Sequence, residues 1–251
     1  MINVLLCGAN GKMGNAVRRA AKDNELINIV AGYDINTTPC EFPVFDDLAK
    51  ITEKVDCIID FSHPALVDGI LDYATARKIP AVICTTGLSK DQISKLQFCA
   101  DKTGIFFSAN MSIGVNLLID LVCKASKVLD GSFDIEIVEK HHNQKLDAPS
   151  GTALAIADAV ADTVSFDAKY VYDRHSVRQK RDKAEIGIHA VRGGNIVGEH
   201  TVIFAGCDEV IELKHQATSK EVFAVGALRA ALFMHNKSAG LYNMQDLVKE
   251  F

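Results

Sequence analysis

The sequence has little of the excess positive charge that nucleic-acid-binding proteins carry. Its 27 lysines and arginines are outnumbered by 32 aspartates and glutamates, which gives a formal net charge of −5. Because a basic field draws proteins to phosphate backbones, nucleic acid is not an expected partner. A local basic site stays open, since net charge does not say where the charges lie.

The seven cysteines form no C-x-x-C pair and follow no regular spacing. An odd number of scattered cysteines is no disulfide framework and indicates reduced thiols in a reducing compartment. Cys7, Cys57 and Cys84 lie inside apolar runs, which is typical of small buried hydrophobic residues.

Long apolar runs are also missing. None approaches the ~20 residues that span a bilayer. The first residues lack the basic segment and the small-residue cleavage site of a signal peptide. We therefore expect no membrane partner and a cytoplasmic location. The 251 residues are enough for one large domain or two modest ones.

Short apolar runs alternate with longer helical patterns through the first part of the chain. This alternation predicts a parallel sheet covered by helices on both faces. The expected strands are 4–7, 27–33, 55–60, 81–84 and 105–108, and the expected helices are 12–22, 64–77 and 89–102.

The pattern changes after residue 110, and a second domain is expected there. Gly193-Gly194 predicts a tight hairpin turn between two strands, which indicates an antiparallel or mixed sheet. A final helix over 223–233 is rich in small residues, and we expect it to pack back on the first domain. The second domain is expected to hold helices over 115–129 and 151–164, strands over 133–139, 185–191, 196–205 and 209–215, and a charged loop over 170–183.

A glycine-rich loop, Gly8-Ala-Asn-Gly11-Lys-Met-Gly14, follows the first expected strand and opens a helix. Such glycines let the backbone turn sharply and approach a pyrophosphate, which sits on the N–H groups that open the helix. Asp34 ends the second strand, where an acid binds the adenosine ribose hydroxyls. The pattern predicts dinucleotide binding; an ordinary glycine turn with a solvated acid is the alternative.

The residue after Asp34 is Ile35 rather than a basic residue. A 2′-phosphate near Asp34 would meet like charge, so we expect a preference for NADH over NADPH, which Lys12 could partly offset. Small polar residues that line a nicotinamide pocket are expected at the carboxyl ends of strands, in the segments 60–64, 84–87 and 108–111.

The segment 139–152 concentrates His141, His142 and Lys145 and then opens a helix at Ser150, a plausible N-cap. A helix N-terminus beside cations is typical of a carboxylate or phosphate site, and histidine suits proton transfer near neutral pH. The alternative is a capped helix after an exposed polar loop. No metal site is expected, because adjacent strand residues point to opposite faces and no cysteine lies nearby. The other histidines are expected to be structural.

These residues together resemble one family, 4-hydroxy-tetrahydrodipicolinate reductase, also called dihydrodipicolinate reductase, of the diaminopimelate route to lysine. The most specific segment is H-H-N-Q-K-L-D-A-P-S-G-T at 141–152. The other segments that carry the resemblance are G-A-N-G-K-M-G at 8–14, D-F-S-H-P at 60–64, T-T-G at 85–87, A-N-M-S-I-G-V-N at 109–116 and V-G-E-H-T at 197–201. Lys12 and Lys220 depart from the family, which commonly has arginine at both positions.

The resemblance implies an α/β fold with a Rossmann-like parallel-sheet dinucleotide-binding domain over 1–111 and 219–251. A smaller α+β mixed-sheet domain over 112–218 would bind substrate and join a homotetramer. His141 would be the proton donor or acceptor and Lys145 the proton donor. The implied substrate contacts are His142, Ser150, Gly151 and Thr152. The implied cofactor contacts are Gly8, Ala9, Asn10, Gly11, Lys12, Met13, Asp34, Cys84, Thr85, Thr86, Ser108, Ala109, Asn110 and Met111.

The implied reaction is hydride transfer from NADH or NADPH to a cyclic unsaturated imine dicarboxylate, giving tetrahydrodipicolinate. Hydride addition pushes electron density toward the ring nitrogen, which then needs a proton. A cationic site would hold the dicarboxylate and stabilise that charge. Two alternatives stay open: a reductase of another small carboxylate imine, and a dinucleotide-binding sensor without catalysis.

Overall fold

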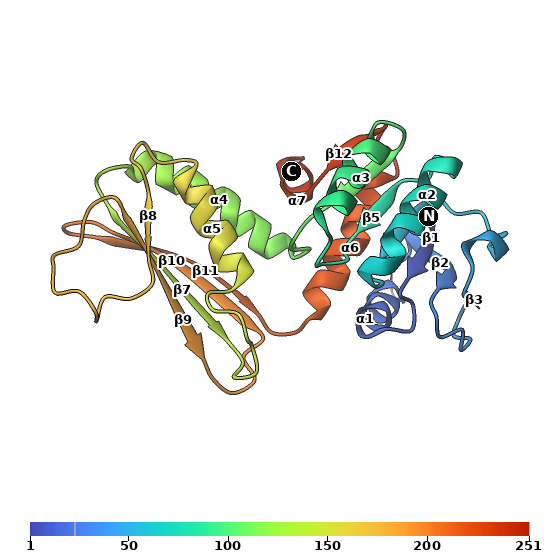
Figure 1. Ribbon diagram of the computed structural model, residues 1–251, viewed down its shortest axis with the longest axis horizontal. Helices are drawn as coiled ribbons and strands as arrows, with labels where there is room; N and C mark the ends of the chain where they lie inside the picture. Colours follow the sequence, from blue (N-terminus) through green and yellow to red (C-terminus); the bar gives the residue numbers. More distant parts are fainter. Residues whose placement is uncertain (23, 251) are drawn as a thin grey trace. The chain divides into compact units, whose positions relative to one another are not determined.

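The computed structural model describes residues 1–22 and 24–250 (Figure 1). The chain folds into two compact units, one formed by residues 1–113 and 220–251 and the other by residues 114–219. The expected domain boundaries lie within two residues of these division points.

The first unit is built on a parallel sheet of seven strands in the order β12-β6-β5-β4-β1-β2-β3. The strand order reverses at β1, whose neighbours are β2 and β4, and ligands of such sheets bind at the strand ends beside this point. The strands are β1 (Ile2–Cys7), β2 (Ile27–Tyr33), β3 (Val44–Phe45), β4 (Cys57–Asp60), β5 (Ala81–Ile83), β6 (Gly104–Phe107) and β12 (Gly240–Tyr242).

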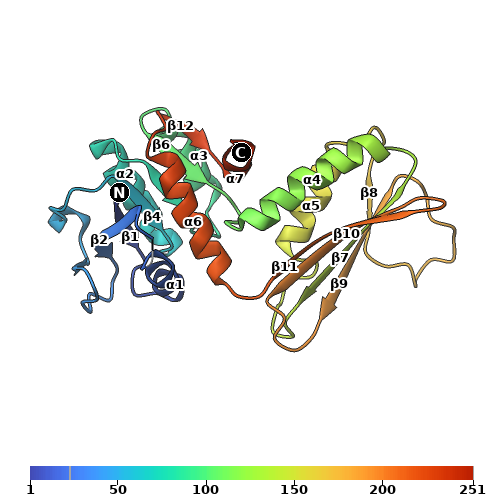
Figure 2. The same cartoon turned by 180° about the vertical axis from the view of Figure 1, so that it is seen from behind.

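Helices cover both faces of this sheet, because its strands are apolar on both sides. Val4 and Leu6 of β1 pack in a core with α1, α6 and α7, whereas Leu5 and Cys7 pack in a second core with α2 and α3. Helix α6 returns from the far end of the chain to lie beside α1, as expected (Figure 2). The helices are α1 (Lys12–Ala21), η1 (Leu48–Lys50), α2 (Pro64–Arg77), α3 (Lys90–Ala100), α6 (Glu221–Met234) and α7 (Met244–Lys249).

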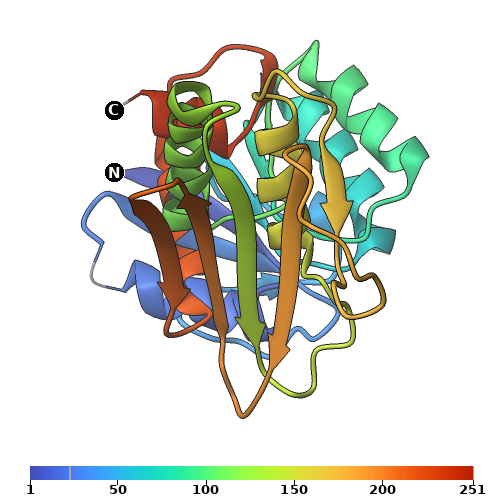
Figure 3. The same cartoon turned by 90° about the vertical axis from the view of Figure 1, so that its left-hand side faces the viewer.

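The second unit holds a mixed sheet of five strands in the order β11-β10-β7-β9-β8, seen face-on in Figure 3. Helices α4 (Ile113–Leu129) and α5 (Gly151–Ala161) pack on one face of it through Leu118, Val122 and Ile156. The strands are β7 (Asp134–His141), β8 (Lys169–Val171), β9 (Glu185–Arg192), β10 (Gly198–Ala205) and β11 (Val210–Ala217).

The hairpin expected at Gly193-Gly194 is wrong. Strand β7 lies between β9 and β10, pairing parallel with β9 and antiparallel with β10. Strand β7 gains a partner on each side, and the glycine turn instead carries the chain past the end of β7. The Gly193 amide donates to the His141 carbonyl at 2.9 Å, and the Asn143 amide donates to the Gly194 carbonyl at 3.2 Å.

The remaining differences are local. The stretch expected as a loop over 170–183 begins inside β8, and β3, η1, β12 and α7 were not expected. Strand β7 continues to His141, two residues beyond its expected end. Within the described part of the chain, no helix combines the length and the apolar character needed to cross a membrane.

Candidate active site

The glycine loop between β1 and α1 leaves no space for side chains at two of its three glycines. Gly8 has a φ of 75°, and a Cβ there would lie 2.5 Å from the carbonyl oxygen of Phe61. A Cβ at Gly14 would collide with the carbonyl oxygen of Gly8. Gly11 is the N-cap of α1 and makes no side-chain hydrogen bond to the helix, which suits the binding of an anion at the first-turn N–H groups.

Asp34 lies beside this loop at the end of β2. Its carboxylate accepts hydrogen bonds from the backbone amides of Asn10 and Asn36, both at 2.9 Å. The Asn10 side chain donates in turn to the carbonyls of Asn36 and Thr38 at 2.7 and 3.0 Å. These bonds tie the loop after β2 to the glycine loop and hold the acid where a ribose hydroxyl donor is expected.

A cavity of about 340 Å³ lies in the first unit at the carboxyl ends of β4, β5 and β6. Eight of the residues predicted to bind cofactor line it, which brings together the first turn of α1 and the loops after β5 and β6. Phe61 and Ser62 belong to the segment 60–64, which was also expected at this pocket, whereas no sequence signal marked Phe223. The lining residues are Met13, Phe61, Ser62, Cys84, Thr85, Thr86, Ser108, Ala109, Asn110, Met111 and Phe223.

Asp60 forms a buried support next to this cavity. Its side chain accepts from the Thr85 hydroxyl at 2.7 Å and from the Ser62 amide at 2.9 Å. Burial raises the pKa of Asp60, although the hydrogen bonds from Ser62 and Thr85 oppose that change. The carboxyl group therefore fixes the ends of β4 and β5 relative to each other.

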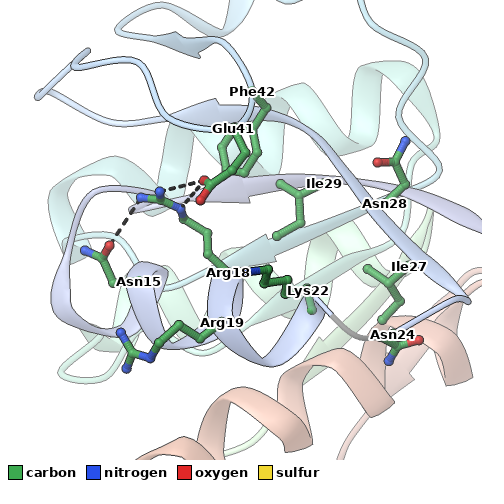
Figure 4. Close-up of a pocket in the computed structure, with 11 residues that line it drawn as sticks. Asn15, Arg18, Arg19, Lys22, Asn24, Ile27, Asn28, Ile29, Glu41 and Phe42 are labelled. Atoms are coloured by element: carbon green, nitrogen blue, oxygen red, sulfur yellow. Dashed lines mark hydrogen bonds and ion pairs between the residues drawn. The ribbon is translucent and has the colours of Figure 1, made fainter.

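A larger cavity of about 550 Å³ lies along α1 and β2 (Figure 4). None of the predicted site residues lines it. One of its cations, Arg18, is already bonded to Glu41 at 2.6 and 2.9 Å and to Asn15 at 3.2 Å. The smaller cavity is therefore the candidate cofactor pocket.

In the second unit, Ser150 caps α5, as predicted. Its hydroxyl oxygen accepts from the Ala153 amide at 3.2 Å, and the residue is buried. Gly151 and Thr152 form the first turn of the helix directly behind this cap. The helix therefore begins beside the loop that carries the predicted cations.

Glu139 is the residue of this site that the sequence analysis missed as a functional group. Its side chain is fully buried and accepts from His141 Nδ1 at 2.7 Å, from the Ser150 amide at 3.0 Å and from two nitrogens of Arg192, each at 2.7 Å. Burial acts to raise the pKa of Glu139, but bonds from Arg192, His141 and Ser150 outweigh it and lower that pKa.

His200 packs beside His141, with ring centroids 5.2 Å apart in an edge arrangement. Its Nε2 lies 3.0 Å from the Ser150 hydroxyl, so it joins the same hydrogen-bond network. Burial, helped by the nearby His141, lowers the pKa of His200 to about 4. His200 is therefore neutral at pH 7 and adds no charge.

Lys145 and His142 lie just beyond β7. Lys145 Nζ contacts Asp147 Oδ1 at 2.8 Å, and the Asp147 carbonyl accepts from Arg192 at 2.7 Å. His142 is half-buried and is the first residue past the strand. Within residues 1–22 and 24–250, no group of three or more histidine, cysteine, aspartate or glutamate side chains is placed to hold a metal ion.

The doubly covered parallel sheet, the glycine loop and the cavity at the strand ends define a dinucleotide-dependent oxidoreductase. Two family models match the chain: "Dihydrodipicolinate reductase, N-terminus" over residues 2–111 and "Dihydrodipicolinate reductase, C-terminus" over residues 114–248. The chain belongs to the dihydrodipicolinate reductase family.

Relatives and a solved structure agree with this family along the whole chain. The 4-hydroxy-tetrahydrodipicolinate reductase of Caldanaerobacter subterraneus subsp. tengcongensis is 53% identical over 250 residues, covering 100% of this chain and 99% of the relative. That of Clostridium tetani is 49% identical, covering 99% and 97%. The structure of dipicolinate-bound dihydrodipicolinate reductase from Paenisporosarcina sp. TG-14 has a TM-score of 0.82 at 27% identity, covering 98% of this chain and 99% of that one.

Proposed function

We propose that this chain reduces 4-hydroxy-tetrahydrodipicolinate to tetrahydrodipicolinate with NADH or NADPH, in the diaminopimelate route to lysine. The observation that carries this proposal is the family match over both units, together with full-length relatives that bear the name of this activity. The dipicolinate in the Paenisporosarcina structure is a planar dicarboxylate, which supports a dicarboxylate substrate.

The first unit would hold the cofactor, whose nicotinamide supplies the hydride when bound. The amides at the start of α1 would bind the pyrophosphate, since Gly8 and Gly14 let the backbone come close. Asp34 would accept from the ribose hydroxyls. The cavity between Met13 and Met111 would receive the nicotinamide ring, and its polar wall residues would orient the carboxamide.

The second unit would bind substrate and deliver the proton. His142, Ser150, Gly151 and Thr152 would bind the carboxylates at the positive end of α5. His141 and Lys145 would handle the proton that the ring nitrogen takes up after hydride addition. The cationic surroundings would stabilise the negative charge that develops on that nitrogen in the transition state.

Substitution of the two proton-handling residues tests these roles. We expect His141→Gln and Lys145→Ala each to lower kcat/KM by about 10²- to 10⁴-fold, because general acid–base catalysis contributes that much. NADH binding to the first unit should be unchanged. Matched controls are the exposed His235→Gln and Lys124→Ala, the latter removing a similar Lys–Asp pair at 2.7 Å. Full turnover in both site variants would refute the assigned roles.

We propose a preference for NADH because the Asp34 carboxylate would repel a 2′-phosphate and Ile35 offers no compensating cation. The ratio of kcat/KM for the two cofactors measures this preference. Asp34→Ser should shift the ratio toward NADPH, since it removes the like charge. A wild-type enzyme that strongly prefers NADPH would contradict the proposal.

We propose a homotetramer joined through the second unit. In the described chain no helix crosses the sheet face opposite α4 and α5, which carries Val138, Ile203 and the half-exposed Val210 (Figure 3). Apolar side chains on an uncovered sheet favour association with another copy. Light scattering should give four times the chain mass of 27.2 kDa; a monomer would contradict this proposal.

A further inference from the structure

We propose that Glu139, together with Arg192, is a positioning residue that fixes the ring orientation and the tautomer of His141. In this arrangement Nδ1 carries a proton bonded to Glu139, and Nε2 is the atom that exchanges a proton with the substrate. The inference rests on the proton-transfer role proposed above for His141.

The pairing follows from the geometry of β7. Residues i and i+2 of a strand share one face. Ile135, Ile137, Glu139 and His141 accordingly alternate with less buried neighbours. A carboxylate is only an acceptor, so its 2.7 Å contact with Nδ1 requires a proton on that nitrogen. The tautomer of neutral His141 is then the one with a free acceptor at Nε2.

Arg192 keeps the buried carboxylate charged. It stands opposite His141 in the parallel pairing of β7 and β9, which brings its guanidinium to Glu139. The two 2.7 Å bonds form a bidentate pair, the arrangement in which arginine binds carboxylates most strongly. Because the pKa of Glu139 is lowered, the group remains an acceptor at neutral pH.

The opposite edge of the His141 ring faces a glycine, which has no side chain to crowd it. A Cβ at Gly198 of β10 would lie 3.1 Å from Nε2 and 3.5 Å from Cδ2. Among the described residues, the hydrogen bond of the His141 ring is made through Nδ1 to Glu139. The ring of His200, which lies on the same strand as Gly198, makes an edge contact with the His141 ring. The ring is thus held at Nδ1, and no side chain of residue 198 crowds Nε2.

The charged groups around His141 are few, which makes a pH profile informative. They are Glu139 on its own strand, Arg192 on β9 and the Lys145–Asp147 pair in the loop. His200 faces the ring from β10, and His215 of β11 stands opposite His200. Of these, Glu139 is the anion bonded directly to the ring. Removal of its charge should therefore weaken the protonated form of His141.

The test is a double-mutant cycle in the full-length enzyme with Glu139→Gln, His141→Gln and the double variant. Glu139→Gln should lower kcat/KM by about 10- to 100-fold, as one charge-assisted hydrogen bond is worth about 1.5–3 kcal/mol. In the His141→Gln background the same change should cost almost nothing further, because Glu139 acts through His141. Glu139→Asp should restore part of the activity.

The pH profile provides the readout that a merely structural role would not change. The relevant limb of the kcat/KM profile against pH is the one that disappears in His141→Gln. In Glu139→Gln this limb should move to lower pH, and in Glu139→Asp it should return toward its wild-type position. The matched control is Glu136→Gln, since Glu136 lies on the outer face of the same strand and also bonds a histidine, His189, at 2.7 Å and two arginines. That control should leave the profile in place.

The outcomes separate the inference from the function on which it rests. Equal losses from Glu139→Gln in the wild-type and His141→Gln backgrounds, with an unmoved pH limb, would overturn the positioning role alone. Full activity of His141→Gln would overturn the proposed proton transfer and the positioning role with it. NADH titration of each variant reports whether the cofactor-binding unit is intact.

Discussion

The guanidinium of Arg192 forms two parallel hydrogen bonds of 2.7 Å with the carboxylate of Glu139, which is fully buried. The same guanidinium donates to the Asp147 carbonyl at 2.7 Å. One arginine thus connects β9, β7 and the loop that leads into α5. The pair thus stabilises the part of the second unit that we propose to bind substrate, and it is the pair that would orient His141.

Removal of the arginine should be costly. Arg192→Met leaves the Glu139 carboxylate buried without its cation, and breaking such a pair costs about 3–5 kcal/mol of unfolding free energy. Because Arg192 is one-fifth exposed, we expect a value near the lower end, about 3 kcal/mol. Urea unfolding measures it. The exposed Arg178→Met should change stability by less than about 0.5 kcal/mol; equal effects of the two changes would contradict the account.

Acid should destabilise the protein partly through His200. Its pKa is 6.5 in the unfolded chain and about 4 when folded, so the unfolded state takes up the proton first. The stability contributed by neutral His200 is complete above pH 6.5 and is lost as pH falls toward 4, by about 3 kcal/mol in total. Urea unfolding at several pH values should show a flatter dependence for His200→Gln between pH 6.5 and 5. An unchanged slope would show that His200 does not titrate in this way.

Two glycines should respond oppositely to alanine. Gly14→Ala forces a Cβ into the carbonyl of Gly8, so we expect weaker NADH binding and a loss of about 1–3 kcal/mol in stability. Gly69 lies inside α2 with nothing within 4 Å of an added Cβ, and Gly69→Ala should raise stability by about 0.5–1 kcal/mol. Fluorescence titration with NADH and thermal unfolding report both effects. Normal cofactor affinity in Gly14→Ala would contradict the assigned loop.

Most of the first unit follows from local signals in the sequence. The helix 64–77 and the strand 27–33 were predicted with the bounds that the structure gives to α2 and β2. In α2, Pro64 follows the His63 N-cap and marks the start of the helix. The short elements β3, β12 and α7 have two to six residues each, too few for a period to be recognised.

The second unit was less predictable because its pairing is not local. The sequence shows that strands β9 and β10 are separated by a glycine turn, but not that β7, more than 40 residues earlier, lies between them. His141, His142, Lys145 and Ser150 were marked as a candidate anion site by their concentration in one segment, and their separate roles came from the family resemblance. Glu139 was not marked, although it lies two residues before His141 on an alternating strand, which puts both side chains on the buried face. Its partner Arg192, whose charge makes a buried carboxylate tolerable, lies 53 residues away in the sequence.

The most direct measurement is turnover of chemically generated 4-hydroxy-tetrahydrodipicolinate by the purified chain, followed through nicotinamide absorbance. The account predicts consumption of reduced cofactor that depends on substrate and protein and falls steeply in His141→Gln. If neither NADH nor NADPH is consumed by the wild-type protein in the presence of that substrate, the proposed function is wrong.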